Sequence, residues 1–94
     1  MAKIRVKVLN YFHFTTKQTY LDYEGDTVGD VILQFVADYK EVLDPMLLTE
    51  DKTDFKPEPV NILLNGRNIL YLEYYNTPVK EGDLIVLSMA IAGG

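Results

Sequence analysis

The sequence predicts an α+β fold in which a mixed β-sheet packs against one main helix. Residues 3–8 alternate basic and apolar side chains, as expected of a strand with one buried face. Residues 31–39 place apolar side chains at helical spacing, which predicts an amphipathic helix. Residues 84–87, Leu-Ile-Val-Leu, form an unbroken apolar run. Such a run is typical of a strand that is covered on both faces in the middle of a sheet.

The first half of the chain is expected to form a strand hairpin and then the main helix. Residues 10–16 carry a cluster of aromatic side chains through a predicted turn, and residues 17–23 resume a weaker strand pattern. A helix is expected to start after Gly25-Asp26. Thr27 can cap the backbone N–H of Asp30, and the negative charge of Asp30 favours the first turn of a helix.

The second half is expected to supply two short strands before the final one. Residues 60–64 alternate apolar side chains and run into Asn65-Gly66, a strong signal for a tight turn. Residues 67–71 can then return as a short paired strand. Residues 72–79 contain Asn-Thr-Pro and are expected to be irregular or to form a single helical turn. Residues 80–83 form the turn before the terminal strand.

These elements bury their apolar faces most economically if the helix crosses the hairpin and the last strand inserts beside the first. The apolar face of residues 4–8 would then meet residues 31–36 of the helix. That arrangement is the β-grasp, or ubiquitin-like, fold. We expect it to occupy residues 1–94 as a single domain, with a flexible C-terminal tail from about residue 90.

Composition argues against several classes of function. The 94 residues carry a formal net charge of −5, whereas nucleic-acid binding depends on clustered Lys and Arg. The alternating Lys3, Arg5 and Lys7 are expected to lie on a solvated strand face. The chain has no cysteine, which excludes disulfides, thiolate metal sites and cysteine nucleophiles. No apolar run suits a membrane helix, and the first residues lack a secretory signal, so we expect a cytoplasmic protein.

The last residues are the candidate for the working part of the molecule. Gly93 and Gly94 lack Cβ, so the backbone of another protein can approach them closely. Residues 90–94 reach about 17 Å when fully extended, enough to thread a narrow channel in a partner. A terminal carboxylate is ionised near neutral pH and can attack an activated phosphate. It is not an activated acyl group, so acyl chemistry needs an outside enzyme and energy source.

Other chemistry-bearing residues are expected to have local roles. His13 is the only histidine, and the sequence does not place a catalytic partner for it. Glu50, Asp51 and Asp54 suggest a cation site, but their spacing does not match a calcium-binding EF-hand loop, so a solvated loop is expected. The sequence therefore predicts no metal site and no catalytic residue within the chain.

Three stretches near the C-terminus form a specific combination. Residues 61–69 contain the Asn-Gly turn, residues 77–83 contain a Gly-Asp turn, and residues 91–94 read Ile-Ala-Gly-Gly. Each turn is common by itself, whereas their order and their distance from a terminal Gly-Gly are not. Together they resemble the MoaD/ThiS family of ubiquitin-like sulfur carrier proteins, and the expected order of strands and helix agrees through the rest of the chain.

The resemblance implies a definite chemistry. In that family an adenylating, ubiquitin-activating-like enzyme uses ATP and Mg to activate the C-terminal glycine, here Gly94, which is then converted to a thiocarboxylate. The carrier inserts its tail into a second enzyme, such as the large subunit of molybdopterin synthase, and donates sulfur. Gly93 would give clearance, and Ile91 and Ala92 would help hold the tail. The chain itself would bind no cofactor and would not be an enzyme.

The resemblance leaves the pathway and two other classes of function open. Molybdopterin or tungstopterin biosynthesis is the leading pathway, while thiamine-type carriers and carriers for tRNA thiolation share the same tail. A protein modifier would use the same adenylated tail but would end as an amide on a lysine. A β-grasp interaction domain would use its exposed surface and not the tail.

Overall fold

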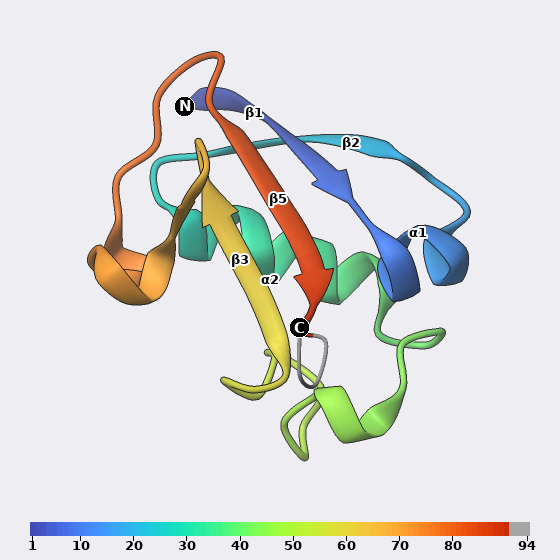
Figure 1. The fold of residues 1–94 in the computed structure, drawn as a ribbon. Coiled ribbons are helices and arrows are strands. Elements are labelled where there is room, and N and C mark those ends of the chain that lie inside the picture. Colours follow the sequence, from blue (N-terminus) through green and yellow to red (C-terminus); the bar gives the residue numbers. More distant parts are fainter. Residues whose placement is uncertain (91–94) are drawn as a thin grey trace.

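The structure, a computed structural model, describes residues 1–90 and confirms the predicted α+β, β-grasp architecture. Five strands form one mixed sheet, and the longer helix crosses one of its faces (Figure 1). The strands and α-helices are β1 (Ala2–Val8), α1 (Asn10–Thr16), β2 (Tyr20–Gly25), α2 (Val28–Tyr39), β3 (Val60–Leu64), β4 (Arg67–Asn68) and β5 (Leu84–Met89). Three short 3-10 helices complete the described elements, η1 (Pro45–Leu47), η2 (Ile69–Tyr71) and η3 (Tyr74–Asn76).

The last strand lies in the middle of the sheet, as predicted. The strand order is β2-β1-β5-β3-β4, with β5 parallel to β1 and antiparallel to β3. In register, Leu87 of β5 stands between Val8 of β1 and Ile62 of β3. Leu87 and Ile85, two residues earlier on the same face of β5, are fully buried. The strand that leads to the C-terminus is therefore held by hydrogen-bond ladders along both edges.

Helix α2 begins with the predicted cap. The Thr27 hydroxyl accepts the N–H of Asp30 at 3.2 Å, and the Asp30 carboxylate accepts the N–H of Thr27 at 3.2 Å. This reciprocal arrangement satisfies two N–H groups that a helix start leaves free. Residues Val31, Phe35 and Val36 are fully buried in one cluster with the inward face of β1, which confirms the predicted packing.

The predicted turn at residues 10–16 is wrong, because these residues form helix α1. Phe12 is fully buried there, with ring centroids 6.0 Å from Phe35 and 5.6 Å from Phe55 in edge-to-face geometry. One helical turn later, the Thr16 hydroxyl donates to the Phe12 carbonyl. Burial of this aromatic side chain selects a helical turn, and β2 consequently starts only at Tyr20, later than expected.

The predicted return strand at residues 67–71 is also shorter than expected. Only Arg67 and Asn68 pair with β3, and the Asn68 side chain then accepts the N–H of Leu70 and starts the 3-10 turn η2. That turn buries Ile69 in the core. The single helical turn expected within residues 72–79 is present as η3.

Two turns that the sequence singled out lock the start of β5. The Asn65 side chain donates to Asp83 Oδ1 at 3.1 Å and accepts the N–H of Leu84 at 3.0 Å. Asp83 is nearly buried, and its Oδ2 accepts the N–H of Lys80 at 2.9 Å. The Asn-Gly turn and the Gly-Asp turn are therefore parts of one hydrogen-bonded unit.

Replacing Asp83 with Ala should lower the free energy of unfolding by about 1–3 kcal/mol, because partner N–H groups at a nearly buried position lose their acceptor. Urea denaturation measures the change. Glu41→Ala, which removes an exposed carboxylate, should change the same quantity by less than about 0.5 kcal/mol. Equal effects of the two variants would contradict this role of Asp83.

The hydroxyl of Tyr75 donates to Asp54 at 2.7 Å, and burial, with this hydrogen bond next, raises the pKa of Tyr75 well above its ordinary value. A group with a raised folded-state pKa stabilises the fold fully below its unfolded pKa, and this contribution is lost as pH rises further. Stability should therefore fall above about pH 10. Urea denaturation at pH 9, 10 and 11 should show a shallower fall in Tyr75→Phe than in the original protein. Parallel curves would contradict the expectation.

Candidate functional site

The predicted site residues Ile91, Ala92, Gly93 and Gly94 lie outside the described residues. The structure instead defines the base from which they leave. Strand β5 ends at Met89, and Ala90 follows it with an exposed side chain. The candidate site is therefore built from the groups that hold Met89 and Ala90 and from the surface beside them.

Two hydrogen bonds fix the end of β5 from opposite sides. The N–H of Met89 donates to the side-chain oxygen of Asn10, at the start of α1, at 3.1 Å. The N–H of the next residue, Ala90, donates to the carbonyl of Pro59, just before β3, at 2.6 Å. Sequence reasoning missed both Asn10 and Pro59, because each lies far from the C-terminus in the chain and neither belongs to a motif.

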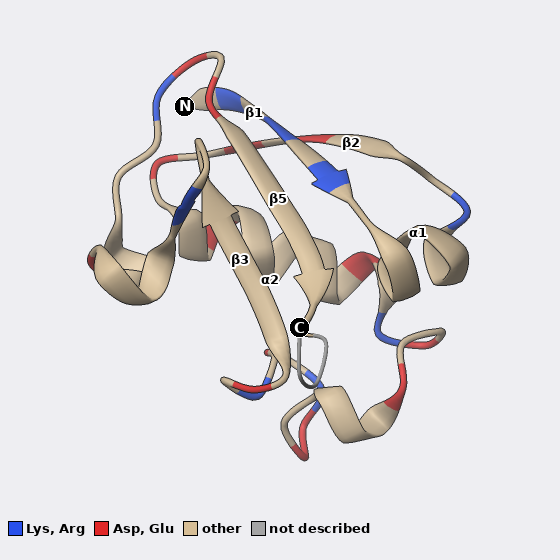
Figure 2. Ribbon diagram, viewed as in Figure 1, with Lys and Arg blue, Asp and Glu red and all other residues tan. Residues whose placement is uncertain are grey.

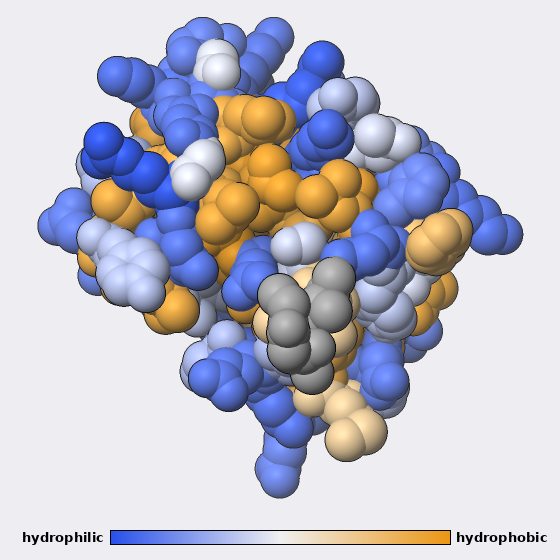
Figure 3. All heavy atoms as spheres, in the orientation of Figure 1, coloured by the Kyte–Doolittle hydropathy of each residue, from blue (hydrophilic) through white to orange (hydrophobic). Residues whose placement is uncertain are grey.

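The prediction that β5 is covered on both faces is wrong. Ile85 and Leu87 are buried beneath α2, whereas Leu84 and Val86 point to the opposite face and are only half-buried. Leu63 of β3 stands beside Val86 in register and is half-buried as well. Figure 3 shows an apolar surface at the middle of this uncovered side of the sheet. We call Leu63, Leu84 and Val86 the open apolar patch.

Basic residues of β1, blue on the ribbon in Figure 2, stand beside the open apolar patch in the sheet. In register, Arg5 stands beside Leu84 and Lys7 stands beside Val86. Arg5 binds Asp22 of β2 at 3.0 Å, and this hydrogen bond lowers the pKa of Asp22 and raises that of Arg5. Both partners are largely exposed, which confirms that this is a solvated strand face.

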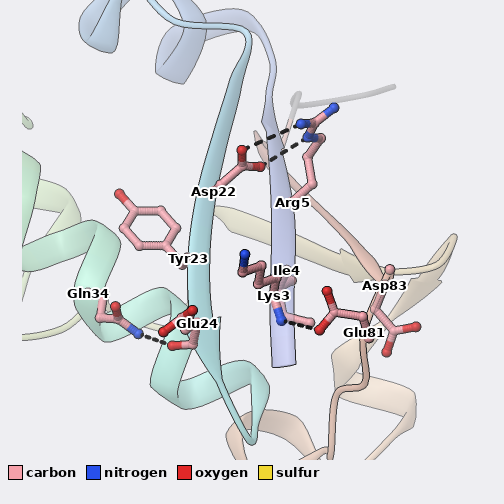
Figure 4. A pocket seen from close by; sticks show the side chains of 10 residues that line it. Lys3, Ile4, Arg5, Asp22, Tyr23, Glu24, Gln34, Glu81 and Asp83 are labelled. Carbon is pink, nitrogen blue, oxygen red and sulfur yellow. Dashed lines mark hydrogen bonds and ion pairs between the residues drawn. The ribbon is translucent and has the colours of Figure 1, made fainter. Parts of the chain in front are cut away.

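A hollow beside β1 and β2 is lined by polar groups that form hydrogen bonds with one another (Figure 4). The Arg5–Asp22 pair lies at one end. Gln34 donates to the carbonyl of Glu24 at 2.6 Å, and Glu81 accepts the N–H of Lys3 at 2.9 Å. The ten residues that line the hollow include no Ser, Thr, Cys or His. It therefore contains no Ser–His or Cys–His pair of nucleophile and base.

The remaining chemistry-bearing residues have the local roles that the sequence predicted. The His13 ring nitrogen Nδ1, in helix α1, lies 2.9 Å from the carbonyl oxygen of Gln18, two residues after that helix ends. Asp51 accepts hydrogen bonds from the hydroxyls of Thr49 and Thr53, which lower its pKa. Asp54 accepts the Tyr75 hydroxyl. Two of the three acidic side chains of this loop therefore organise the loop and its contacts.

Residues 1–90 contain neither a cluster of metal-ligating side chains nor a helix that could cross a membrane. In this part of the chain, no three His, Asp or Glu side chains gather as they would around a metal ion. No helix among the same residues has the length and apolar character needed to cross a membrane.

Comparison with known proteins agrees with the fold. The ThiS family model matches residues 9–94. Small archaeal modifier protein 3 of Haloferax volcanii is 32% identical over 68 residues, which cover 72% of this chain and 70% of the relative. The relative is thus named as a modifier protein.

Solved structures share the fold of this protein over nearly the whole chain. Small archaeal modifier protein 1 of Methanosarcina acetivorans superimposes with a TM-score of 0.83 at 28% identity, covering 100% of this chain and 98% of that one. A Pyrococcus furiosus protein provisionally described as molybdopterin converting factor subunit 1 gives a TM-score of 0.70 at 21% identity, covering 97% and 100%. At this lower identity the second likeness concerns the fold.

The family model spans nearly the whole chain, and the modifier relative shares about a third of its residues over most of its length. These proteins are small ubiquitin-like carriers and modifiers and not catalytic enzymes. The chain belongs to the ThiS family of ubiquitin-like sulfur carrier and modifier proteins.

Proposed function

We propose that the protein is a sulfur carrier whose C-terminal Gly94 is converted to a thiocarboxylate and donates sulfur to a second enzyme. The observation that carries the proposal is the position of β5. The strand is held between two neighbours, ends at Met89, and is followed by five residues that finish in Gly-Gly. This arrangement joins a fixed scaffold to a narrow chain end, in a chain that belongs to the ThiS family.

The proposed chemistry assigns the catalysis to partner proteins. A Gly94 carboxylate oxygen attacks the α-phosphorus of ATP and pyrophosphate leaves, which gives an acyl adenylate. A sulfide-equivalent nucleophile from the activating system then attacks the acyl carbon and AMP leaves, so that sulfur replaces oxygen. ATP and magnesium belong to the adenylating partner. Gly93 and Ala92 keep the chain narrow, and Ile91 and Ala92 supply the side chains by which a partner holds the tail.

The open apolar patch is the surface by which we propose that the adenylating enzyme docks. Leu84 and Val86 lie on β5, the same strand that leads to Gly94, so an enzyme that takes the tail also lies close to the patch. Arg5 and Lys7 flank the patch along β1. An apolar centre with acidic groups at its rim is the complementary surface on the enzyme, because complementary charges steer association and fix its register.

The leading acceptor is the large subunit of a molybdopterin or tungstopterin synthase. The residue pattern around Asn65-Gly66 supports this pathway. A thiamine-type acceptor and a tRNA-thiolating acceptor require the same thiocarboxylate, so they fit the fold and the tail equally well. Supplying the purified acceptors one at a time to the sulfur-loaded carrier would decide among them.

A protein modifier is the second candidate, favoured by the 32% identity to small archaeal modifier protein 3. In that case a lysine amine would attack the activated Gly94 and form an amide. Cell extracts would then contain higher-mass conjugates that depend on Gly94. If the chain were a β-grasp interaction domain that does not use its tail, partner binding would survive the addition of one residue after Gly94.

Incubation with a cognate adenylating enzyme, ATP and a sulfur source should raise the intact mass by about 16 Da, because sulfur replaces one oxygen. Mass spectrometry measures the gain. Deletion of Gly93 and Gly94 should abolish it, since the acyl group then lies two residues short of the enzyme's reacting centre. Sulfur loading and delivery by the shortened protein would refute the proposal.

Leu63→Gln should raise the KM of the adenylating enzyme for the carrier at least about fivefold and leave kcat nearly unchanged, because it weakens docking but not chemistry. The matched control is Leu33→Gln. Leu33 is an apolar residue of α2, 42% exposed, on the helix that covers the other face of the sheet. This control should leave both constants unchanged, and equal behaviour of the two variants would count against docking at the open apolar patch.

A further inference from the structure

Where β1 ends beside β5, a side-chain oxygen takes the place of the backbone carbonyl that would regularly accept the N–H of Met89. In a parallel ladder, one residue donates its N–H to one neighbour on the next strand and accepts from the neighbour two residues later. Leu9 follows this pattern for its donor, since its N–H reaches the carbonyl of Leu87 at 3.0 Å. Its carbonyl would be the regular acceptor for Met89. That carbonyl instead accepts the N–H groups of Phe12 at 3.0 Å and His13 at 3.4 Å, the first bonds of α1.

The side chain of Asn10 supplies the missing acceptor. Its Oδ1 accepts the N–H of Met89 at 3.1 Å and the N–H of Tyr11 at 2.8 Å. The Asn10 backbone has φ of 41°, a left-handed conformation that Asn tolerates better than most residues. Asn10 therefore turns the chain from β1 into α1 and extends the ladder on β5 by one hydrogen bond at the same time.

Two consecutive N–H groups of the C-terminal strand are thus held from opposite sides. Asn10 holds Met89 from the α1 side, and the Pro59 carbonyl holds Ala90 from the β3 side. The four residues that follow span at most about 14 Å, so a rotation of about 10° at their base would move their end by about 2 Å. Misplacement of a reacting group by about 1 Å can cost about a hundredfold in rate.

We propose that Asn10 is a positioning residue that sets the direction in which the C-terminal residues enter the active site of the adenylating enzyme. The inference rests on the proposed carrier function. Asn10 is exposed, and its contact with Met89 lies at the end of the sheet, outside the buried core. Its loss should therefore change the delivery of Gly94 more than the stability of the fold.

Asn10→Gly and Asn10→Asp form a matched pair of variants. Glycine accepts a φ of 41° without strain and removes the acceptor oxygen. Aspartate also tolerates this backbone and keeps an oxygen at the same place. With the adenylating enzyme, Asn10→Gly should lower kcat for sulfur loading about tenfold and leave KM within about twofold, whereas Asn10→Asp should stay within about twofold of the original protein in both.

Amide hydrogen exchange followed by NMR provides a readout that does not depend on sulfur chemistry. The Met89 amide should exchange at least about tenfold faster in Asn10→Gly, while the amides of Ile85 and Leu87 keep their original rates. In Asn10→Asp the Met89 amide should stay protected. Unchanged protection of Met89 in Asn10→Gly would overturn the proposal.

The two readouts separate failure of this inference from failure of the proposed function. If the original protein gains sulfur and Asn10→Gly matches it in kcat, positioning by Asn10 is refuted and the carrier function stands. If the original protein gains no sulfur with an active enzyme, the carrier function fails, and positioning for that reaction fails with it. A loss of Met89 protection in Asn10→Gly would then still establish the hydrogen bond itself.

Discussion

The placement of β5 between β1 and β3 is the constraint on which the rest of the structure depends. The β1–β2 hairpin and the β3–β4 pair belong to one sheet only because β5 bonds to both. The side chains of Ile85 and Leu87, on the same strand, belong to the buried cluster beneath α2. The residue run that closes the sheet is thus also the run that ends, five residues later, at the C-terminus. In the proposed carrier function, the residues after β5 would enter a partner while the scaffold stays folded.

The two faces of the sheet differ in how far their side chains are covered. One face is covered by α2 and contains fully buried side chains, and the other leaves Leu63, Leu84 and Val86 half-exposed beside basic residues of β1. A second helical layer over that side would cover this surface.

Local signals in the sequence predicted much of this fold, and contacts between distant residues account for the errors. The Thr27–Asp30 cap and the Asn65-Gly66 turn depend on neighbouring residues, so the sequence contains them directly. Helix α1 depends on burial of Phe12 against Phe35 and Phe55, which no local pattern reveals. The apolar run of β5 indicated a central strand correctly, but composition alone does not tell whether one or two layers cover it.

Some residues of the candidate site are likewise evident from local sequence, and others only from contacts between distant residues. Gly93 and Gly94 are recognisable from their type and position, whereas Asn10 acquires its proposed role from a hydrogen bond to a residue 79 positions later.

Native-state hydrogen exchange tests the central claim most directly, because it reports how firmly β5 is held between β1 and β3. The amides of β5 should exchange only through global unfolding, with an opening free energy equal to that from urea denaturation. Exchange of Ile85 and Leu87 through local opening at a much lower free energy would contradict it.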